Sequence, residues 1–376
     1  MKGKLALVGV LALVASSLAA QTIHVEPPFE PAFPSSRALG DSIVASAQGF
    51  ESLYTNPAGF AIGKPSLTLV SGAGGLSPMP TTAGLQNLGS AWADPASAPR
   101  LLGPSGFGAT IAAGIGYAGS GLGLGLIIGG ETWGSDYLNS QTTLAFVGGM
   151  AFPVGDHFFF GGAIRPMVRV EVPSLQAGDL FTFLRNPRSS GIDAQSLYGF
   201  GVALDLGGIA QYGPFSYGLA VTDIAGTRMY YAQDSLNALA SSLLSGGGLP
   251  NGQTLSDAYT IPMQATAGLS YHPNLGRAAS FFDPKLEVDY AYRFLPGDLL
   301  KVPTNTDLLD GIRAGVDLRL LSFFHLRAGY EYGRLSAGAG VQLPGLQIET
   351  ELFERVAPSN ISGPDQGASA GISIRF

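Results

Sequence analysis

The feature that most constrains this chain is a two-residue alternation of charged and large apolar side chains in its C-terminal third. Residues 285–294, 312–320 and 324–332 each place charged or small residues on one face and Leu, Ile, Val, Phe or Tyr on most positions of the other. A period of two is that of a β-strand, and this division of faces is typical of a barrel strand between lipid and a polar lumen. A soluble β-sandwich is the alternative, but its turns should carry more charge.

The composition favours a membrane barrel. Charged residues make up 12% of the chain, against about 25% in ordinary soluble domains. After residue 20, Gly or a polar residue interrupts every apolar run before it reaches the length of a membrane helix, and a closed β-barrel is the other structure that satisfies its backbone in lipid. The net charge of −7 gives no sign of nucleic-acid binding.

Counting alternating segments predicts an all-β fold, a transmembrane antiparallel β-barrel of about fourteen strands, an even number as in bacterial barrels. Most connections alternate between tight turns and long loops, which indicates a periplasmic and an extracellular end, with both chain ends periplasmic. Two connections fit this less well, a longish periplasmic one at 273–283 and a tight extracellular one near Gly333. The predicted strands cover residues 65–73, 106–117, 119–133, 141–152, 157–172, 196–209, 215–223, 259–272, 284–294, 308–320, 323–332, 335–343, 346–353 and 367–376.

The two ends of the sequence carry export signals. Residues 1–20 combine Lys2 and Lys4, an apolar run and small residues, which is the layout of a signal peptide; the run is short for the alternative, a membrane anchor. The last predicted strand alternates and closes on Phe376. Such an ending looks like the signal that outer-membrane barrels present to the barrel-insertion machinery, although an ordinary edge strand could also end in Phe. We therefore expect outer-membrane lipids and this machinery as partners.

Residues 35–61 are the one early segment with strong turn signals. Pro57 fixes its own φ and disfavours a helical Asn56, and Gly59 tolerates unusual φ values, so the run predicts a turn. Upstream, Asp41 reads as the N-cap of a short helix through Ala47. A unit of about 25 residues is too small to fold alone. We therefore expect it to lie in a cavity that the rest of the chain provides.

This order of features resembles the FadL-type family of long-chain fatty acid outer-membrane transporters and its relatives similar to the PorV protein of type nine secretion. The residue-specific part is the run Leu53-Tyr54-Thr55-Asn56-Pro57-Ala58-Gly59-Phe60. The resemblance implies a signal peptide (1–20), a hatch (21–62) that plugs the lumen, and a barrel (63–376). It also implies capture of hydrophobic ligands near extracellular loops and their exit at a kinked third strand. The hatch or gate would comprise Asn56, Pro57, Ala58, Gly59 and Phe60.

The inward residues of the predicted strands agree with a plugged lumen. On strands two to four they are mostly Gly, Ala and Thr, which leaves room for an insert. Charges of both signs follow on later strands, which favours a network that braces the hatch over an ion-selective ring. The predicted lumen network is Arg165, Arg169, Glu287, Asp289, Arg313, Asp317, Arg327 and Glu331.

Two predicted extracellular loops contain amphipathic helical patterns, at residues 178–184 and 235–244, and the first long loop is rich in Leu and Trp. Exposed apolar groups there suggest a collection site for a hydrophobic ligand, but the loops could equally pack on one another over the barrel mouth. The candidate ligand-collecting residues are Leu180, Phe181, Phe183, Leu239, Leu243 and Trp92.

Nothing in the sequence indicates catalysis. The four His residues have no metal-ligand spacing, and His325, the one lumen candidate for a Ser–His pair, reads better as a wall residue. We expect no enzyme activity and no cofactor. The sequence thus predicts passive uptake of hydrophobic small molecules, fatty acids or aromatic hydrocarbons, through a hatch-gated barrel. The alternatives are a PorV-like docking partner for secreted proteins and a surface adhesin or antigen.

Overall fold

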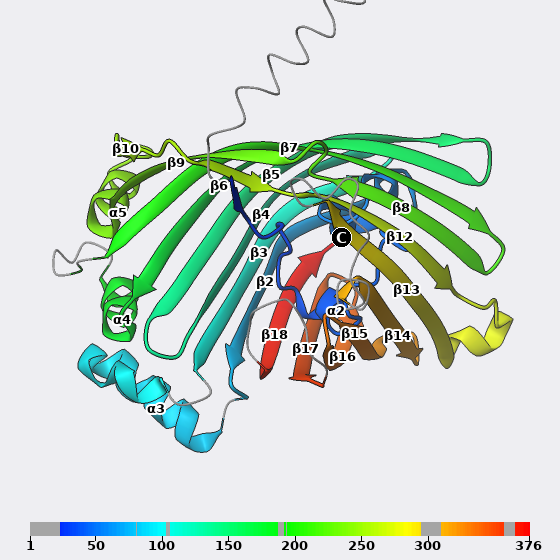
Figure 1. Cartoon of the computed structure of the whole chain (residues 1–376). Helices are drawn as coiled ribbons and strands as arrows, with labels where there is room; N and C mark the ends of the chain where they lie inside the picture. The colour runs from blue at the N-terminus through cyan, green and yellow to red at the C-terminus, as the bar shows by residue number, and fades with distance from the viewer. Residues whose placement is uncertain are drawn as a thin grey trace, which may run out of the picture.

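The structure, a computed structural model, describes residues 23–79, 81–102, 106–186, 192, 194–294, 310–356 and 365–376. The predicted signal peptide (1–20) lies outside these residues. The described chain forms one closed antiparallel barrel with a separate segment inside it (Figure 1).

Fourteen strands form the barrel wall in the described part of the chain, as predicted, and β18 closes the wall by pairing with β2. Two of the fourteen are interrupted: β8 and β9 together make the seventh, and β11 and β12 the eighth. The elements of the wall are β2 (Ser66–Ser77), β3 (Phe107–Gly119), β4 (Leu122–Gly134), β5 (Leu138–Val154), β6 (Phe158–Leu175), β7 (Gln195–Tyr212), β8 (Phe215–Thr222), β9 (Thr227–Ser235), β11 (Ala258–Ile261), β12 (Met263–Tyr271), β13 (Phe282–Phe294), β14 (Ile312–Leu320), β15 (Phe324–Glu331), β16 (Arg334–Leu343), β17 (Leu346–Arg355) and β18 (Gln366–Arg375).

The period-two pattern explains the two faces of this wall. On β4, Leu122, Leu124 and Leu126 are exposed on the outside, while Gly123 and Gly125 between them face the lumen. Large apolar side chains are exposed in the same way on all the remaining wall strands that are long enough to show the alternation. A continuous apolar exterior on a closed barrel is suited to the hydrocarbon core of a membrane.

The seventh strand is longer than predicted. After a break at residues 223–226, where Asp223, Ala225 and Gly226 all have positive φ, it continues as β9 to Ser235. The polar and glycine residues of the break resemble a turn in the sequence, so the prediction of a loop from residue 224 was wrong. The alternation resumes beyond the break, with Met229 and Tyr231 buried and Tyr230 exposed.

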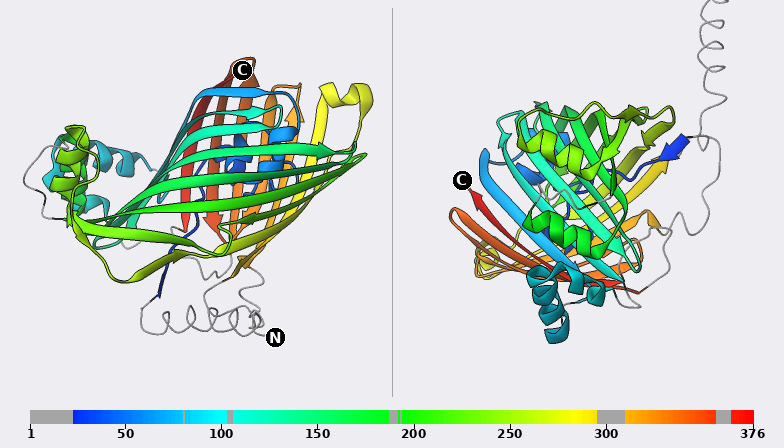
Figure 2. Two further views of the ribbon diagram at one scale, coloured as in Figure 1. Left: turned by 90° about the horizontal axis from the view of Figure 1, so that it is seen from above. Right: turned by 90° about the vertical axis from the view of Figure 1, so that its left-hand side faces the viewer.

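The helices mark the two ends of the barrel. At the end that we call the long-loop end lie α3 (Thr82–Ala93), η3 (Pro95–Leu101), α4 (Ala177–Arg185) and α5 (Leu236–Leu244), and the two predicted loop helices are thereby confirmed (Figures 1 and 2). The opposite, short-turn end holds η4 (Gly276–Ser280) and most of the tight turns, the turn at Tyr332 and Gly333 being at the long-loop end. None of the helices in the described ranges is long and apolar enough to cross a membrane.

Residues 26–62, which we call the inner segment, lie inside the barrel (Figure 2). They contain only short helical turns, α2 (Pro34–Arg37), η1 (Gly49–Leu53) and η2 (Pro57–Ala61). The predicted helix from Asp41 to Ala47 is absent: Asp41 has a φ of 49°, and the Val44 N–H donates to the Asp289 carboxylate of β13 (2.9 Å). A partner in the wall has replaced the intrahelical hydrogen bond there.

Glycines of the wall make room for the inner segment around most of the circumference. A Cβ atom on Gly123 would lie 2.6 Å from Phe60 Cε2, and one on Gly125 would lie 2.7 Å from Leu53 Cδ1. Real Cβ atoms essentially never come so close, so these positions require glycine for as long as the segment stays in place. The other wall glycines that meet the inner segment in this way are Gly114, Gly116, Gly149, Gly161, Gly207, Gly218, Gly315, Gly329 and Gly338, and a Cβ on Gly129, Gly268 or Gly371 would lie 3.2 to 3.3 Å from the segment.

The first described residues lie on the long-loop side of the barrel, while the prediction that both chain ends share the other side concerns an N-terminus outside the described residues. Ile23–Val25 form β1, which pairs in parallel with β11, and β11 precedes β12 on the long-loop side. Phe376 lies at the short-turn end, where it exchanges backbone hydrogen bonds with Leu67 of β2.

We predict that Gly123→Ala lowers the free energy of unfolding of the barrel by about 1–3 kcal/mol, because its methyl group would overlap the Phe60 ring. Gly72→Ala is the matched control, since a Cβ there meets no atom within 4 Å. Urea unfolding in lipid vesicles measures both. Equal stability of the two variants would contradict the close fit between wall and inner segment.

Candidate functional site

Asn56 is the residue that joins the inner segment to the wall most closely. Its Oδ1 accepts a hydrogen bond from the Ala58 N–H (3.1 Å), which caps the η2 turn that begins at Pro57. Its Nδ2 donates to the Val44 carbonyl oxygen (3.0 Å) and lies 3.3 and 3.4 Å from the carbonyl oxygens of Gly208 and Leu219. Asn56 is 0% exposed. One short amide therefore links two turns of the inner segment with β7 and β8.

The sequence around Asn56 explains this position. Pro57 starts the helical turn with a residue that has no N–H to satisfy, and Asn56 itself keeps an extended backbone. Gly207 of β7 faces the amide, and a Cβ there would lie 3.0 Å from Asn56 Cγ. Among the other predicted gate residues, Pro57, Ala58, Gly59 and Phe60 are all buried.

The aromatic side of the inner segment packs against the small-residue wall. Phe33, Phe50 and Tyr54 form a cluster with ring centroids 5.5 to 6.1 Å apart. Phe60 is 0% exposed and fills the space opposite Gly123 and Gly149. Burial of these rings provides an apolar attachment of the segment to strands β3 to β6.

The charged side of the inner segment faces strands β13 to β18. Arg313 binds Glu30 (2.7 Å), and Arg375 binds Glu51 (2.6 Å). The Ser46 hydroxyl donates to Glu287, which also pairs with Lys285 (3.1 Å). With the Asp289–Val44 hydrogen bond, these contacts bring four of the wall's charged residues directly onto the inner segment.

Other predicted network residues pair within the wall. Asp317 accepts from His325 Nδ1 (2.9 Å) and contacts Arg327 (3.4 Å), and Arg327 also binds Glu349 (2.8 Å). Glu331 lies between Arg334 (3.2 Å) and Arg313 (3.7 Å). These pairs connect neighbouring strands, except that Arg327–Glu349 joins β15 to β17 across β16, so they brace the barrel.

Arg165 and Arg169 lie apart from that network, on β6. Arg165 binds both Asp205 (3.1 Å) and Asp223 (3.0 Å), and thus holds the break in the seventh strand. Arg169 binds Glu26 of the inner segment (3.1 Å). All five of these side chains are buried, so loss of one partner would leave an uncompensated charge.

Two acids of the inner segment have opposite pKa shifts. Burial acts to raise the pKa of Glu30, but Arg313 and Arg293 outweigh it and hold the pKa at about 2. Burial and the nearby Glu331 carboxylate raise the pKa of Asp41 to about 7. Glu30 is therefore a fixed anion near neutral pH, whereas Asp41 titrates there.

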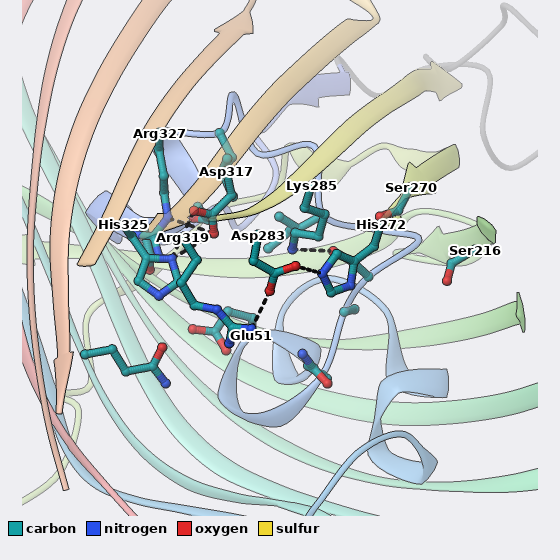
Figure 3. A pocket seen from close by; sticks show the side chains of 18 of the residues that line it. Glu51, Ser216, Ser270, His272, Asp283, Lys285, Asp317, Arg319, His325 and Arg327 are labelled. Atoms are coloured by element: carbon teal, nitrogen blue, oxygen red, sulfur yellow. Dashed lines mark hydrogen bonds and ion pairs between the residues drawn. The ribbon is translucent and has the colours of Figure 1, made fainter. Parts of the chain in front are cut away.

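The inner segment separates two cavities. A cavity of about 450 Å³ lies at the short-turn end, lined on the wall side by Asp283, Arg319 and His325 and on the segment side by Ser46 and Glu51. Figure 3 shows Asp283 of this cavity between Arg319 and His272, with which it pairs. A cavity of about 50 Å³ lies on the other side and is lined by residues that include Phe29, Glu30, Thr222, Asp223, Gln264 and Thr266.

The predicted ligand-collecting residues do not form one surface. Phe181 and Leu239 are buried, and Leu180 and Phe183 are partly buried against the cluster around Phe181. Trp92 and Leu243 are 53% and 50% exposed. The loop helices therefore pack on one another, as the alternative interpretation held, and they also leave apolar side chains exposed; ligand collection stays a prediction.

The third strand is not the interrupted one. Strand β4 pairs with β3 over its whole length and with β5 from Leu122 to Trp133, in both cases without a register shift, which does not agree with the kinked third strand implied by the resemblance. The break lies in the seventh strand, opposite the junction of β11 and β12 at Pro262. Proline has no N–H for the ladder, and this accounts for part of the interruption.

Sequence reasoning missed several residues that contact the wall or the inner segment. Glu26, Glu30 and Glu51 of the inner segment and Arg375 of β18 all form ion pairs between the two. A signal was available: an acid in a mostly apolar segment that has to be buried needs a partner. Their partners could not have been named, because strand register decides them.

Several solved structures resemble the fold of this chain. No protein-family model and no curated protein matches the chain. Among solved structures, the toluene transporter TbuX of Ralstonia pickettii has a TM-score of 0.51 at 15% identity, with 92% of this chain and 98% of that chain covered. The toluene transporter TodX of Pseudomonas putida has a TM-score of 0.49 at 12% identity, with 93% and 98% covered. A FadL homologue of Pseudomonas aeruginosa has 0.46 at 13%, with 94% and 99% covered.

At these identities the likeness concerns the fold alone. The fold assignment rests on the comparison with TbuX, whose TM-score is 0.51. The resemblance to FadL-type barrels is confirmed at that level. The chain has the fold of an outer-membrane β-barrel, as its alternating strands and apolar exterior predict.

We predict that Asn56→Ala lowers the free energy of unfolding by about 1–3 kcal/mol, because buried carbonyl oxygens lose their donor. Asn56→Asp should cost more, since a carboxylate would face the carbonyl oxygens of Val44, Gly208 and Leu219. The exposed Asn251→Asp is the control. If unfolding in urea gave the same stability for all three variants, Asn56 would not tie the segment to the wall.

We predict that the inner segment is held less firmly as the pH rises from about 4 to 7. A pKa raised from 3.8 to about 7 means that the protonated form of Asp41 fits the seated segment; this stability is complete below pH 4 and is lost towards pH 7. Burial and Glu171 raise the pKa of Glu26 to about 7 as well, with the same sign.

The measurement uses a cysteine at the buried position Ala47, which is specific because the chain has none of its own. The rate of maleimide labelling, divided at each pH by the rate in Glu26→Gln/Asp41→Asn, should rise severalfold from pH 4 to 7. As a control, the labelling rate of the parent protein is also divided by the rate in Asp156→Asn, a change on an exposed turn. This second ratio should stay near one at every pH. A flat first ratio would refute the assignment.

Proposed function

We propose that this protein is an outer-membrane channel for the passive passage of hydrophobic small molecules, of the long-chain fatty acid or aromatic hydrocarbon class, and that residues 21–62 act as its gate. The observation that carries the proposal is the inner segment itself, which lies between two cavities and fits a wall lined with glycine. A segment that only stabilised a barrel would not need to divide its lumen.

The attachment of the segment supports a gate that can move. Its polar contacts with strands β13 to β18 are ion pairs and hydrogen bonds from short turns, and it contains no helix of more than five residues. The exposed apolar side chains of the loop helices, Trp92 and Leu243 among them, would meet a hydrophobic molecule first. TbuX, whose fold the chain shares, is described as a toluene transporter.

Uptake of labelled toluene and of a labelled long-chain fatty acid tests the proposal, in bacteria that lack the protein and in the same cells after it is restored. We expect restored uptake of at least one ligand, and partial loss with Pro57→Ala, because the turn that carries Asn56 would lose its fixed φ. Pro214→Ala, on an exposed turn, is the matched control and should transport normally.

Equal uptake with and without the protein would reject the channel. Co-purification of a secreted protein would then favour the docking alternative, and normal uptake with loss of cell adhesion would favour the adhesin.

A further inference from the structure

The first described strand, β1, occupies an unusual place in the wall. It pairs in parallel with β11, with Ile23, His24 and Val25 opposite Ala258, Tyr259 and Thr260, whereas the wall strands pair antiparallel. The N–H of Glu26 extends the pairing by donating to the Thr260 carbonyl oxygen (2.9 Å). The other edge of β11 is paired with β9. Thus β1 supplies the second neighbour that β11 needs.

The side chains of β1 follow the inside–outside alternation of the wall. The His24 ring stacks on Tyr259 at 4.7 Å between centroids, and Tyr259 in turn contacts Tyr231 of the lumen. Ile23 and Val25 are 41% and 51% exposed on the opposite face. With apolar residues out and a polar residue in, β1 is part of the wall, although its chain continues directly into the lumen.

The residues after β1 cover the smaller cavity. Glu26 is anchored to Arg169 (3.1 Å). Pro28, Phe29, Glu30 and Pro31 then line the 50 Å³ cavity, and the Phe29 ring lies 5.6 Å from the Arg165 guanidinium. A molecule that entered this cavity from the long-loop end would have to move these residues.

The connection between β1 and the rest of the inner segment is stiff. Four of the eight residues from 27 to 34 are prolines, at positions 27, 28, 31 and 34. Proline fixes φ, and proline-rich stretches are extended and semi-rigid. Such a connection has little slack, so a displacement at the cavity is transmitted to β1.

Among the attachments of the inner segment to the wall, β1 is short and exposed to solvent or lipid, so it can separate most easily. It has three residues, it pairs along one edge only, and its side chains are half-exposed, whereas Phe50, Leu53, Asn56 and Phe60 are buried. The C-terminal end of the inner segment runs directly into β2, so the covalent chain keeps that end attached to the wall.

We propose that β1 is the latch of the gate: residues 28–31 leave the smaller cavity when β1 leaves the edge of β11, and they close it when β1 pairs again. This inference rests on the proposed function in that a ligand on its way through the barrel has to pass residues 28–31, which line the smaller cavity. It adds that the wall and the inner segment open together.

A reversible crosslink tests the latch. In Ile23→Cys/Ala258→Cys the two positions are paired across β1 and β11, and neighbouring strands lie within the Cα separation that a disulfide spans. Ser71→Cys/Ser373→Cys is the control, because these hydroxyls are 3.1 Å apart on β2 and β18 and a bond there leaves β1 free. Each pair is introduced into a chain that has no cysteine of its own.

We expect oxidation of the latch pair to reduce uptake of labelled toluene or fatty acid to the level of cells without the protein, and dithiothreitol to restore it. Oxidation of the control pair should leave uptake unchanged. Full uptake with the latch pair completely oxidised would overturn the proposal.

If the reduced protein transports neither ligand, the proposed function is rejected. A second measurement then tests the latch independently of transport. A third cysteine is placed at Thr266, which is buried in the smaller cavity, and is labelled with an apolar maleimide after the latch pair has been oxidised. Slower labelling than in the reduced protein supports the latch, and equal labelling overturns it.

Discussion

The structure depends on how closely the inner segment approaches the wall. Backbone atoms of the segment lie where side chains of the wall would otherwise be: a Cβ on Gly218 would lie 2.6 Å from the Val44 carbonyl oxygen, and one on Gly315 would lie 2.5 Å from that of Leu39. The chain contains 54 glycines, about twice the usual share, and the lumen contact accounts for fourteen of them that are named above. Glycine is therefore used here to remove side chains from a surface, at a cost in strand propensity.

Close approach also solves the hydrogen-bonding problem of a segment without regular structure. Buried backbone groups need partners, and the short turns of the segment provide few of their own. The wall supplies others, such as the Asp289 carboxylate for Val44, while the Asn56 amide supplies a donor for Val44 and lies near carbonyl oxygens of β7 and β8. Because these wall partners belong to paired strands, they fix the position of the segment inside the barrel.

The sequence predicts the barrel better than it predicts the site. Alternation is a local property, so the strands from 285 to 331 and their lumen charges can be found without a structure. The break after Thr222 could not, because Asp223 to Gly226 has the composition of a turn, and the pairing of β9 with β7 is what restores the strand. The absent helix at 41–47 and the parallel strand β1 depend on partners more than 200 residues away in the chain. For the same reason the acids of the inner segment could be noticed but not paired.

We infer that the seated inner segment closes the lumen. Conductance in planar bilayers tests it most directly, with the intact protein compared with a variant that lacks residues 26–62 and has been shown to remain a folded barrel. We predict no steady ion conductance for the intact protein and a stable open pore for the variant. Equal conductance of the two would contradict it.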